Sequence, residues 1–394
     1  MNTFCKFVKF VLLFIIEETH EAGGKCMGSF RDNLRKIEPY VPGEQPDLPD
    51  MIKLNTNENP YPPTPKVREV LDTYAEDKLR LYPDPKSEAL VKAIAEINGI
   101  SEEQVFVGVG SDDVLAIAFM TFFHSKKPVL FPDITYSFYD VWAELFRIPY
   151  EQIPLNDDFD MVPSDYYKEN GGIVIANPNA PTGVYQGISV LEDIIEHNRD
   201  VAVIIDEAYV DFSEEGTALE LIKKYDNVLI VQTYSKSRSL AGMRIGHAMG
   251  GKELIQAMND VRFSFNSYPM TRLSVEIGAA AIKDQAYFEE TRKKVIATRE
   301  WTKKELARMG FTFRDSMTNF IFAKHETVPA EEIFERLREK HIFVRHFKKP
   351  RISDYLRISI GTDEEMERFA EETKKIIETK KIIEAKKIIK PRES

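Results

Sequence analysis

Short apolar runs alternate with longer amphipathic stretches through the middle of the chain. The longer stretches carry apolar residues at a helical period, whereas the short runs show no alternation and suit strands buried on both faces. Together they predict an α/β fold with a mostly parallel, mixed sheet flanked by helices. The predicted strands are residues 105–107, 129–131, 172–176, 201–205, 228–232 and 245–249, and the predicted helices are 111–122, 136–145, 189–197 and 252–258.

The pattern changes from about Leu273 onward, where long charged helical stretches take over. Long charged helices are predicted over 276–306 and strands at 318–323, 342–345 and 355–360, which indicates a second, smaller α+β domain. The predicted division of the chain is an extension at 1–27, an arm at 28–60, a large domain at 61–272, a small domain at 273–373 that includes part of the arm, and a charged tail at 374–394.

The two ends differ from the rest of the chain. Residues 4–16 are apolar apart from two lysines, which resembles a signal peptide but is too short to span a bilayer. The alternative is an upstream extension, with the working chain starting at Met27. The tail repeats Lys-Ile-Ile-Glu segments every six residues, which does not match the helical repeat. We therefore expect a charged helix that continues the last helix without an apolar stripe.

Charge and cysteine content narrow the possible functions. The formal net charge is -11, which argues against general binding to nucleic acid or its phosphate backbone. Cys5 and Cys26 are the two cysteines, and both lie near the N-terminus. The histidines show no His-Glu-x-x-His spacing, so no metal site is predicted. These features fit a protein of the reducing cytoplasm that does not bind membranes.

Residues suited to binding phosphate follow the first predicted strand of the large domain. Gly108 and Gly110 allow a tight turn, and Ser111 and Asp112 begin the next predicted helix. The free N–H groups at such a helix start suit a phosphate. The segment is not a dinucleotide fingerprint, because Asp113 stands where that motif has its third glycine.

Two other strands deliver ionisable side chains. Asp206 ends the run 201–205, where a carboxylate is costly to bury without a cation such as a protonated pyridine nitrogen. Lys236 follows the run 228–232, and a desolvated amine there favours Schiff-base chemistry. Thr233, Ser235 and Arg244 supply further phosphate ligands. Since ligands of parallel sheets bind beyond the carboxyl ends of the strands, we expect these side chains to meet.

Three segments together resemble the class I and II, fold-type I aminotransferases, which depend on pyridoxal 5'-phosphate. Ser235-Lys236 with Leu240-Ala241-Gly242-Met243-Arg244 is similar to their lysine motif, and Asp206-Glu207-Ala208-Tyr209 to their aspartate and tyrosine pair. Residues 177–183 resemble their Asn-Pro-Thr-Gly loop, and the resemblance covers about 28–378. Ala180 stands where the family usually has asparagine, so Asn179, Asn177 or Tyr209 alone would contact the cofactor's phenolic oxygen.

The resemblance implies a role for each matched residue. Lys236 would bind the cofactor covalently and move protons, Asp206 would hold the pyridine nitrogen protonated, and Tyr209 would contact the phenolic oxygen. Tyr136 would stack on the ring. The family is homodimeric, and Tyr61 would reach the cofactor phosphate of the partner chain. The remaining cofactor contacts implied are Gly110, Ser111, Asp112, Asn179, Thr233, Ser235 and Arg244.

Within that group the chain is similar to the histidinol-phosphate aminotransferase family. Arg357 matches the arginine that binds the substrate α-carboxylate, and Tyr40 with Arg345 matches the pair that binds the substrate phosphate. The reaction implied is transamination of L-histidinol phosphate with 2-oxoglutarate, in histidine biosynthesis. Alternatives are a broad-specificity aromatic aminotransferase and a decarboxylase or lyase of the threonine-phosphate decarboxylase type. A regulator that only senses the cofactor would need a DNA-binding helix-turn-helix, which the N-terminus does not offer.

Overall fold

The structure is a computed structural model that describes residues 30–389, with side chains described as far as residue 383. The predicted extension at 1–27 and the last residues of the predicted tail lie outside this range. Residues up to Pro39 form one unit and residues from Tyr40 onward a second. In the first unit, Phe30–Asn33 form a short 3-10 helix. The second unit contains everything described below.

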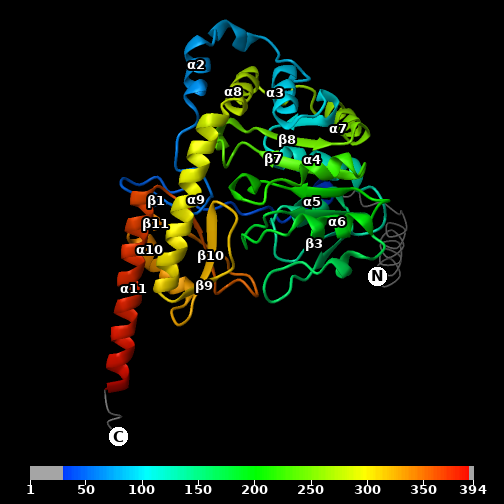
Figure 1. Cartoon of the computed structure of the whole chain (residues 1–394). Coiled ribbons are helices and arrows are strands. Elements are labelled where there is room, and N and C mark those ends of the chain that lie inside the picture. Colours follow the sequence, from blue (N-terminus) through cyan, green and yellow to red (C-terminus); the bar gives the residue numbers. More distant parts are fainter. Residues whose placement is uncertain (1–29, 390–394) are drawn as a thin grey trace, which may run out of the picture. The chain divides into compact units, whose positions relative to one another are not determined.

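A seven-stranded sheet organises most of the second unit (Figure 1). Its strand order is β2-β8-β7-β6-β5-β3-β4, and β8 runs antiparallel to both neighbours while every other pair is parallel. The predicted mixed, mostly parallel sheet is thus confirmed. The strands are β2 Val105–Gly108, β3 Val129–Pro132, β4 Tyr150–Ile153, β5 Gly172–Ala176, β6 Val203–Asp206, β7 Val228–Thr233 and β8 Gly246–Gly250.

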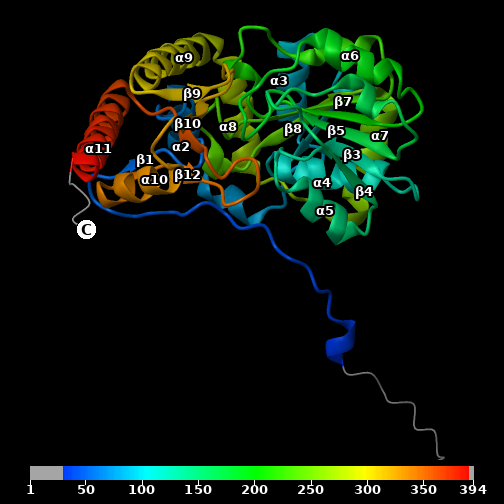
Figure 2. The same ribbon diagram turned by 90° about the horizontal axis from the view of Figure 1, so that it is seen from below.

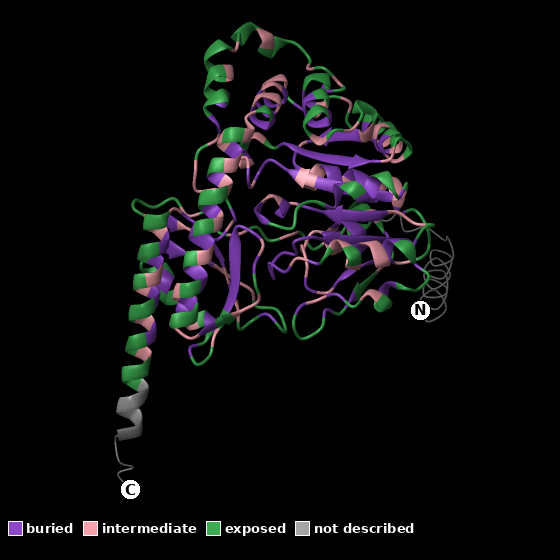
Figure 3. Cartoon of the chain, viewed as in Figure 1, coloured by how far each residue is buried: buried purple, intermediate pink, exposed green. Residues whose placement is uncertain are grey.

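Helices cover both faces of this sheet, and the strands between them are buried (Figure 3). Along β6, Ile204 packs in one core and Ile205 in the other, because successive strand side chains point to opposite faces. Apolar residues of α4, α5 and α7 complete the core of Ile204, and those of α3, α6 and α8 the core of Ile205. The bounds are α2 Pro65–Thr73, α3 Glu88–Asn98, α4 Ser111–Phe122, α5 Tyr139–Phe146, α6 Ile188–Glu196, α7 Lys252–Phe265 and α8 Arg272–Lys283.

A third core belongs to the smaller, C-terminal part of the chain. It lies between a four-stranded antiparallel sheet of order β12-β13-β10-β9, the parallel pair β1-β11, and three helices. This arrangement agrees with the predicted smaller α+β part. The bounds are β1 Ile52–Lys53, β9 Phe311–Phe313, β10 Phe320–His325, β11 Ile342–Phe343, β12 Arg345–His346, β13 Leu356–Ser359, α9 Gln285–Arg308, α10 Ala330–Glu339 and α11 Asp363–Ile389.

The charged helices predicted over 276–306 are α8 and α9. They are separate because the Asp284 side chain accepts the N–H of Tyr287 at 3.2 Å and caps the second helix. The strand predicted at 342–345 is β11 and β12, because its halves pair with β1 and β13 respectively. Ile277 of α8 packs in the core of the large sheet. We therefore propose that the boundary between large and small parts lies after α8 rather than at residue 272.

The predicted C-terminal helix is confirmed as far as the structure describes it. Helix α11 runs continuously over 27 residues into the charged repeat. Its side chains leave the core within the repeat, since Ile377 is buried whereas Ile382 is exposed. Lys380 still reaches Glu332 of α10 at 2.5 Å. Among the described residues, no helix is both long and apolar enough to cross a membrane.

Candidate active site

A cavity of about 180 Å³ lies at the carboxyl ends of β5, β6 and β7. This is the edge at which parallel strands place the side chains that follow them. Most of the residues predicted to bind cofactor line it, which confirms that the strand ends converge. The lining residues are Thr56, Glu58, Ser111, Asp112, Tyr136, Ala176, Pro178, Ala180, Asp206, Ala208, Tyr209, Thr233, Ser235, Lys236, Ala241 and Arg244.

Asp206 is the buried acid of the cavity. Its carboxylate accepts hydrogen bonds from the Tyr139 hydroxyl at 2.7 Å and the Ala208 N–H at 3.2 Å. Burial raises the pKa of Asp206 to about 6, although these hydrogen bonds act in the opposite direction. No side-chain cation within residues 40–383 pairs with it. The ionised form therefore lacks a counter-charge that a bound cation would supply.

Lys236 enters the cavity from the loop after β7. Its Nζ donates to the backbone oxygen of Thr56 at 3.2 Å and lies 5.7 Å from the centre of the Tyr209 ring. The loop itself is held by Asn59, whose amide donates to the backbone oxygens of Lys236 and Ser237. The amine is thus in the cavity and free of any carboxylate hydrogen bond in this part of the chain.

The tyrosine partner comes from an unexpected residue. Asn57 Nδ2 donates to the Tyr209 hydroxyl at 2.9 Å, across 152 residues of sequence. Asn179, predicted to contact the cofactor, donates to Ile134 O at 2.8 Å in the segment after β3 and to the Thr182 hydroxyl of its own loop at 3.0 Å. It is not among the residues that line the cavity, and its role as a cofactor ligand stays a prediction.

Asn177 is not among the lining residues either. Its side chain is bonded to the backbone of Gln186 in both directions, as acceptor at 2.7 Å and donor at 3.1 Å. Pro178 and Ala180 of the same loop line the cavity with apolar surface. Tyr209, supported by Asn57, is the hydroxyl that remains for an oxygen of the cofactor.

The predicted phosphate ligands meet at one end of the cavity. Ser111 and Asp112 begin α4, whose first N–H groups have no partner within the helix. Arg244 Nη2 contacts the Asp112 carboxylate at 3.0 Å, and its Nη1 lies 3.5 Å from the Ser235 hydroxyl. Gly110 has φ +87°, and a Cβ there would lie 2.5 Å from Arg244 Nη2. A side chain here would displace the guanidinium of Arg244, and φ +87° is itself unfavourable for a residue with a Cβ.

Asp112 also positions the predicted stacking residue. The Tyr136 hydroxyl donates to its second carboxylate oxygen at 2.7 Å. Burial, with Asp112 beside it, raises the pKa of Tyr136 well above its usual value, so the hydroxyl stays protonated. Asp112 thus serves the cavity through its side chain as well as through its N–H group.

Two arginines lie opposite one another on β12 and β13. Arg345 and Arg357 are direct partners in this antiparallel pair, so their side chains share one face of the small sheet. Arg357 Nη2 donates to Asn55 O at 3.0 Å, while its buried Nε has no hydrogen-bond partner. Burial lowers the pKa of Arg357, and the Arg345 charge acts in the same direction. Neither arginine pairs with a carboxylate of residues 40–383.

The two predicted tyrosines outside the large sheet have different surroundings. Tyr40 stacks on Phe138 with ring centres 4.3 Å apart, and its hydroxyl is close enough to Arg357 to affect the pKa of that arginine. Tyr61 does not line the cavity of its own chain, and Lys294 lies 5.5 Å from its ring centre. Its predicted contact with a partner chain stays a prediction.

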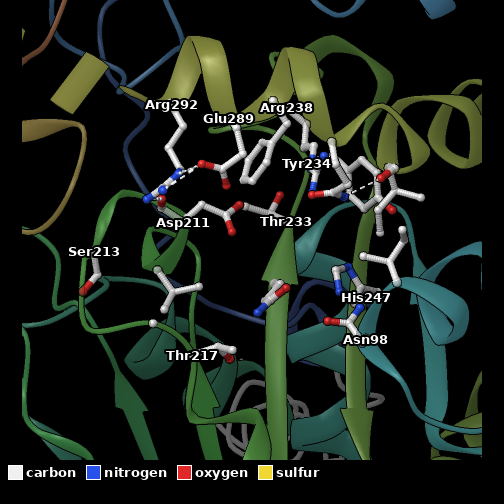
Figure 4. A pocket seen from close by; sticks show the side chains of 17 residues that line it. Asn98, Asp211, Ser213, Thr217, Thr233, Tyr234, Arg238, His247, Glu289 and Arg292 are labelled. Carbon is white, nitrogen blue, oxygen red and sulfur yellow. Dashed lines mark hydrogen bonds and ion pairs between the residues drawn. The ribbon is translucent and has the colours of Figure 1, made fainter. Parts of the chain in front are cut away.

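A second cavity, of about 260 Å³, lies beside β7 and β8 (Figure 4). Thr233 lines both cavities. Figure 4 labels Arg238 among the residues that line this cavity. Its guanidinium stacks on the ring of Phe288 in α9, 3.7 Å from the ring centre. This contact supports the loop that carries Lys236. His247 on β8 is buried, and burial lowers its pKa to about 3. It is therefore neutral and supplies no acid or base near pH 7.

Sequence analysis missed the residues that hold the predicted ones. Tyr139 bonds Asp206, Asn57 bonds Tyr209, and Asn59 holds the lysine loop. The only signal in the sequence was that these residues lie close to two residues predicted to belong to the site, Tyr61 and Tyr136. Their partners lie 67 to 177 residues away, and no local pattern encodes those distances.

The cavity fits pyridoxal phosphate at three points. Asp206 is buried without a counter-cation, as required to face a pyridinium nitrogen. Arg244, Ser235 and the α4 N-terminus form a cup for the phosphate, shaped by Gly110. The Lys236 amine lies in the same cavity. With the doubly wound mixed sheet, these features define a PLP-dependent transferase of fold type I.

The comparisons with known proteins identify the family. The model for aminotransferase class I and II matches residues 49–372, and the chain belongs to that family. It is 50% identical over 349 residues to a histidinol-phosphate aminotransferase of Lactococcus lactis subsp. cremoris, covering 89% of this chain and 98% of the relative. A histidinol-phosphate aminotransferase of Clostridium acetobutylicum is 53% identical over 348 residues, with coverages of 88% and 99%.

A solved structure agrees on the fold. The histidinol-phosphate aminotransferase of Sinorhizobium meliloti, in complex with pyridoxal-5'-phosphate, superposes with a TM-score of 0.75 at 24% identity, covering 83% of this chain and 91% of that one. The family match and the two relatives, rather than this superposition, show that the chain is a PLP-dependent aminotransferase.

Proposed function

We propose that the chain transfers the amino group of L-histidinol phosphate to 2-oxoglutarate, as a step of histidine biosynthesis. The observation that carries this proposal is the Arg345–Arg357 pair. Like charges directly opposite on neighbouring strands are destabilising, so the pair suits substrates that bring anionic groups to this face, which are the phosphate of the donor in one half-reaction and the carboxylates of the keto acid in the other. The names of the relatives at 50% and 53% identity agree with this substrate.

The two arginines divide the recognition of substrate. Arg357, which is partly buried and has an unsatisfied, buried Nε, would bind the α-carboxylate of 2-oxoglutarate or glutamate in a forked geometry. Arg345, with Tyr40, would bind the phosphate ester of the amino donor. An amino acid that lacks the phosphate would leave Arg345 unpaired, which is the basis of specificity.

The residues of the cavity then perform the proton transfers. The bound cofactor supplies an electron sink for the substrate Cα–H bond. Lys236 Nζ would take the proton from Cα and return it to the cofactor side, while Asp206 keeps a proton on the ring nitrogen. Tyr136 would cover one face of the ring, and Arg244 would hold the phosphate.

We also propose a homodimer in the cytoplasm. Four large apolar side chains around the C-terminal end of α7 and the segment 76–82 are 47–80% exposed, and such a group is typical of a protein–protein interface. They are Leu79, Tyr82, Phe265 and Tyr268. The rings of Tyr82 and Tyr268 are in contact, with centres 4.9 Å apart, so the two exposed segments adjoin at this point. Tyr61 would enter the partner's cavity across this interface. A core without cysteine fits a reducing compartment.

An absorption spectrum with single substrates tests the proposed donor. L-histidinol phosphate, added without a keto acid, should convert the visible band of the lysine-bound cofactor to the amine form. Arg345→Ala should lower kcat/KM for this donor by roughly a hundredfold and change the glutamate half-reaction by less than about threefold. Lys236→Ala is the inactive control. A band that does not respond to this donor but responds to aromatic amino acids would favour the broad-specificity aromatic aminotransferase. Release of carbon dioxide from a phosphorylated amino acid that carries an α-carboxylate would favour the decarboxylase.

A further inference from the structure

The connection between β12 and β13, residues 347–355, joins the small sheet to the large one. Figure 2 shows it as an orange segment beside β12. Ile352, in its middle, is 4% exposed and packs in the core of the large sheet. The strands on either side of the connection carry Arg345 and Arg357. The positions of both arginines therefore depend on how this connection is held.

Arg351 is the polar anchor of the connection. Its Nη1 donates to the Asp133 carboxylate at 2.7 Å, and its Nη2 to the backbone oxygens of Leu155 and Asn156 at 2.7 and 3.0 Å. One guanidinium thus donates to a carboxylate and to two backbone carbonyls. The ammonium group of a lysine lacks this planar set of donors. Arg351 has φ +65°, an unfavourable conformation for a residue with a Cβ, and these contacts hold it there.

Asp133 links the anchor to the cofactor cavity. It directly follows β3 and precedes Tyr136 by three residues. Its other oxygen accepts the N–H of Leu155 at 2.9 Å, so the carboxylate ties two loops of the large sheet to Arg351. The segment that carries the stacking tyrosine and the strand pair that carries both arginines are therefore bonded through one ion pair.

We propose that Arg351 is a positioning residue, which holds the β12–β13 pair at the distance from Tyr136 at which Arg345 and Arg357 can bind substrate. The inference rests on the proposed function of those two arginines. Without the hydrogen bonds of the Arg351 guanidinium, the β12–β13 pair occupies the binding-competent position for a smaller fraction of time. The apparent affinity for substrate falls by that fraction. Because the connection carries Arg345, assigned to the donor phosphate, on one side and Arg357, assigned to the keto-acid carboxylate, on the other, both affinities fall together. This separates Arg351 from Arg345, whose loss affects the phosphorylated donor.

The test uses four variants of the holoenzyme. Arg351→Ala and Asp133→Asn should each raise the KM for donor and for keto acid by about tenfold, with kcat within about threefold of wild type. Arg351→Lys keeps the charge but not the planar guanidinium. Its KM values should lie between those of wild type and Arg351→Ala. Lys348→Ala is the matched control, because Lys348 forms an ion pair of the same length, 2.7 Å, in the same connection, but with Glu331 of the small part. It should behave as wild type.

Hydrogen exchange provides a readout that does not depend on the substrate. In Arg351→Ala, amides of residues 347–355 and 153–156 should exchange at least about fivefold faster than in Lys348→Ala. Unchanged exchange, or equal KM values in the two variants, overturns the positioning role. The half-reaction with L-glutamate keeps this test separate from the proposed donor. If glutamate turns over and histidinol phosphate does not, the donor assignment fails while Arg351 is still judged by its effect on glutamate.

Discussion

Replacing Asp206 with asparagine should stabilise the cofactor-free protein near neutral pH while it removes the cofactor's anchor. In the cofactor-free chain this buried carboxylate has no cationic partner, and burial raises its pKa from 3.8 to about 6. Asparagine has nearly the same shape and carries no charge. The variant therefore separates the cost of burying the charge from the benefit that the charge provides when a cation is bound.

The magnitude follows from the pKa. One pKa unit corresponds to about 1.4 kcal/mol, so the ionised form of Asp206 destabilises the cofactor-free fold by roughly 3 kcal/mol above pH 7. The folded state holds its proton more tightly than the unfolded state, so stability is lost as the pH rises from about 4 to about 6. Asparagine cannot accept both existing hydrogen bonds, from Tyr139 and Ala208, which costs about 1 kcal/mol at every pH.

The assay is urea unfolding of cofactor-free wild type and Asp206→Asn at equal protein concentration, since association would shift the apparent stability. As the pH rises from 5 to 8, the unfolding free energy of the variant should increase by roughly 1.5 kcal/mol relative to that of wild type. The hydrogen-bond loss is the same at every pH, so it does not alter this change. Saturating cofactor should reverse the order, because only wild type pairs with the ring nitrogen. A stability difference that does not change with pH would refute the argument that burial controls this carboxylate.

Two further changes probe the phosphate cup and the last helix. Gly110→Ala places a methyl group against Arg244 at φ +87° and should weaken cofactor binding at least about tenfold and destabilise the fold by roughly 1 kcal/mol or more, measured by cofactor titration and thermal unfolding. A cofactor affinity equal to that of wild type would contradict the proposed cup. Ile377→Ala should cost roughly 2–5 kcal/mol because the side chain is buried, whereas Ile382→Ala should stay within about 0.5 kcal/mol. Equal losses of unfolding free energy in urea for the two variants would show that α11 packs differently.

The sequence by itself determined the sheet and the chemical groups at its edge. A run of apolar residues that ends in an ionisable one, as 203–206 does, forms a buried strand with a functional side chain at its carboxyl end. That local rule placed Asp206, Lys236 and the turn at Gly110 around one cavity. It works because parallel strands bring their carboxyl ends to one edge, whatever connects them.

Only the tertiary structure decided which groups support these residues. Asn57 reaches Tyr209, while Asn179, nearer to the expected motif position, bonds to Ile134 in the segment after β3. The opposition of Arg345 and Arg357 depends on the register of β12 and β13. A shift of one residue would have turned one arginine to the other face. Such contacts join segments far apart in the chain, and packing selects them, because hydropathy patterns specify burial but not the identity of distant partners.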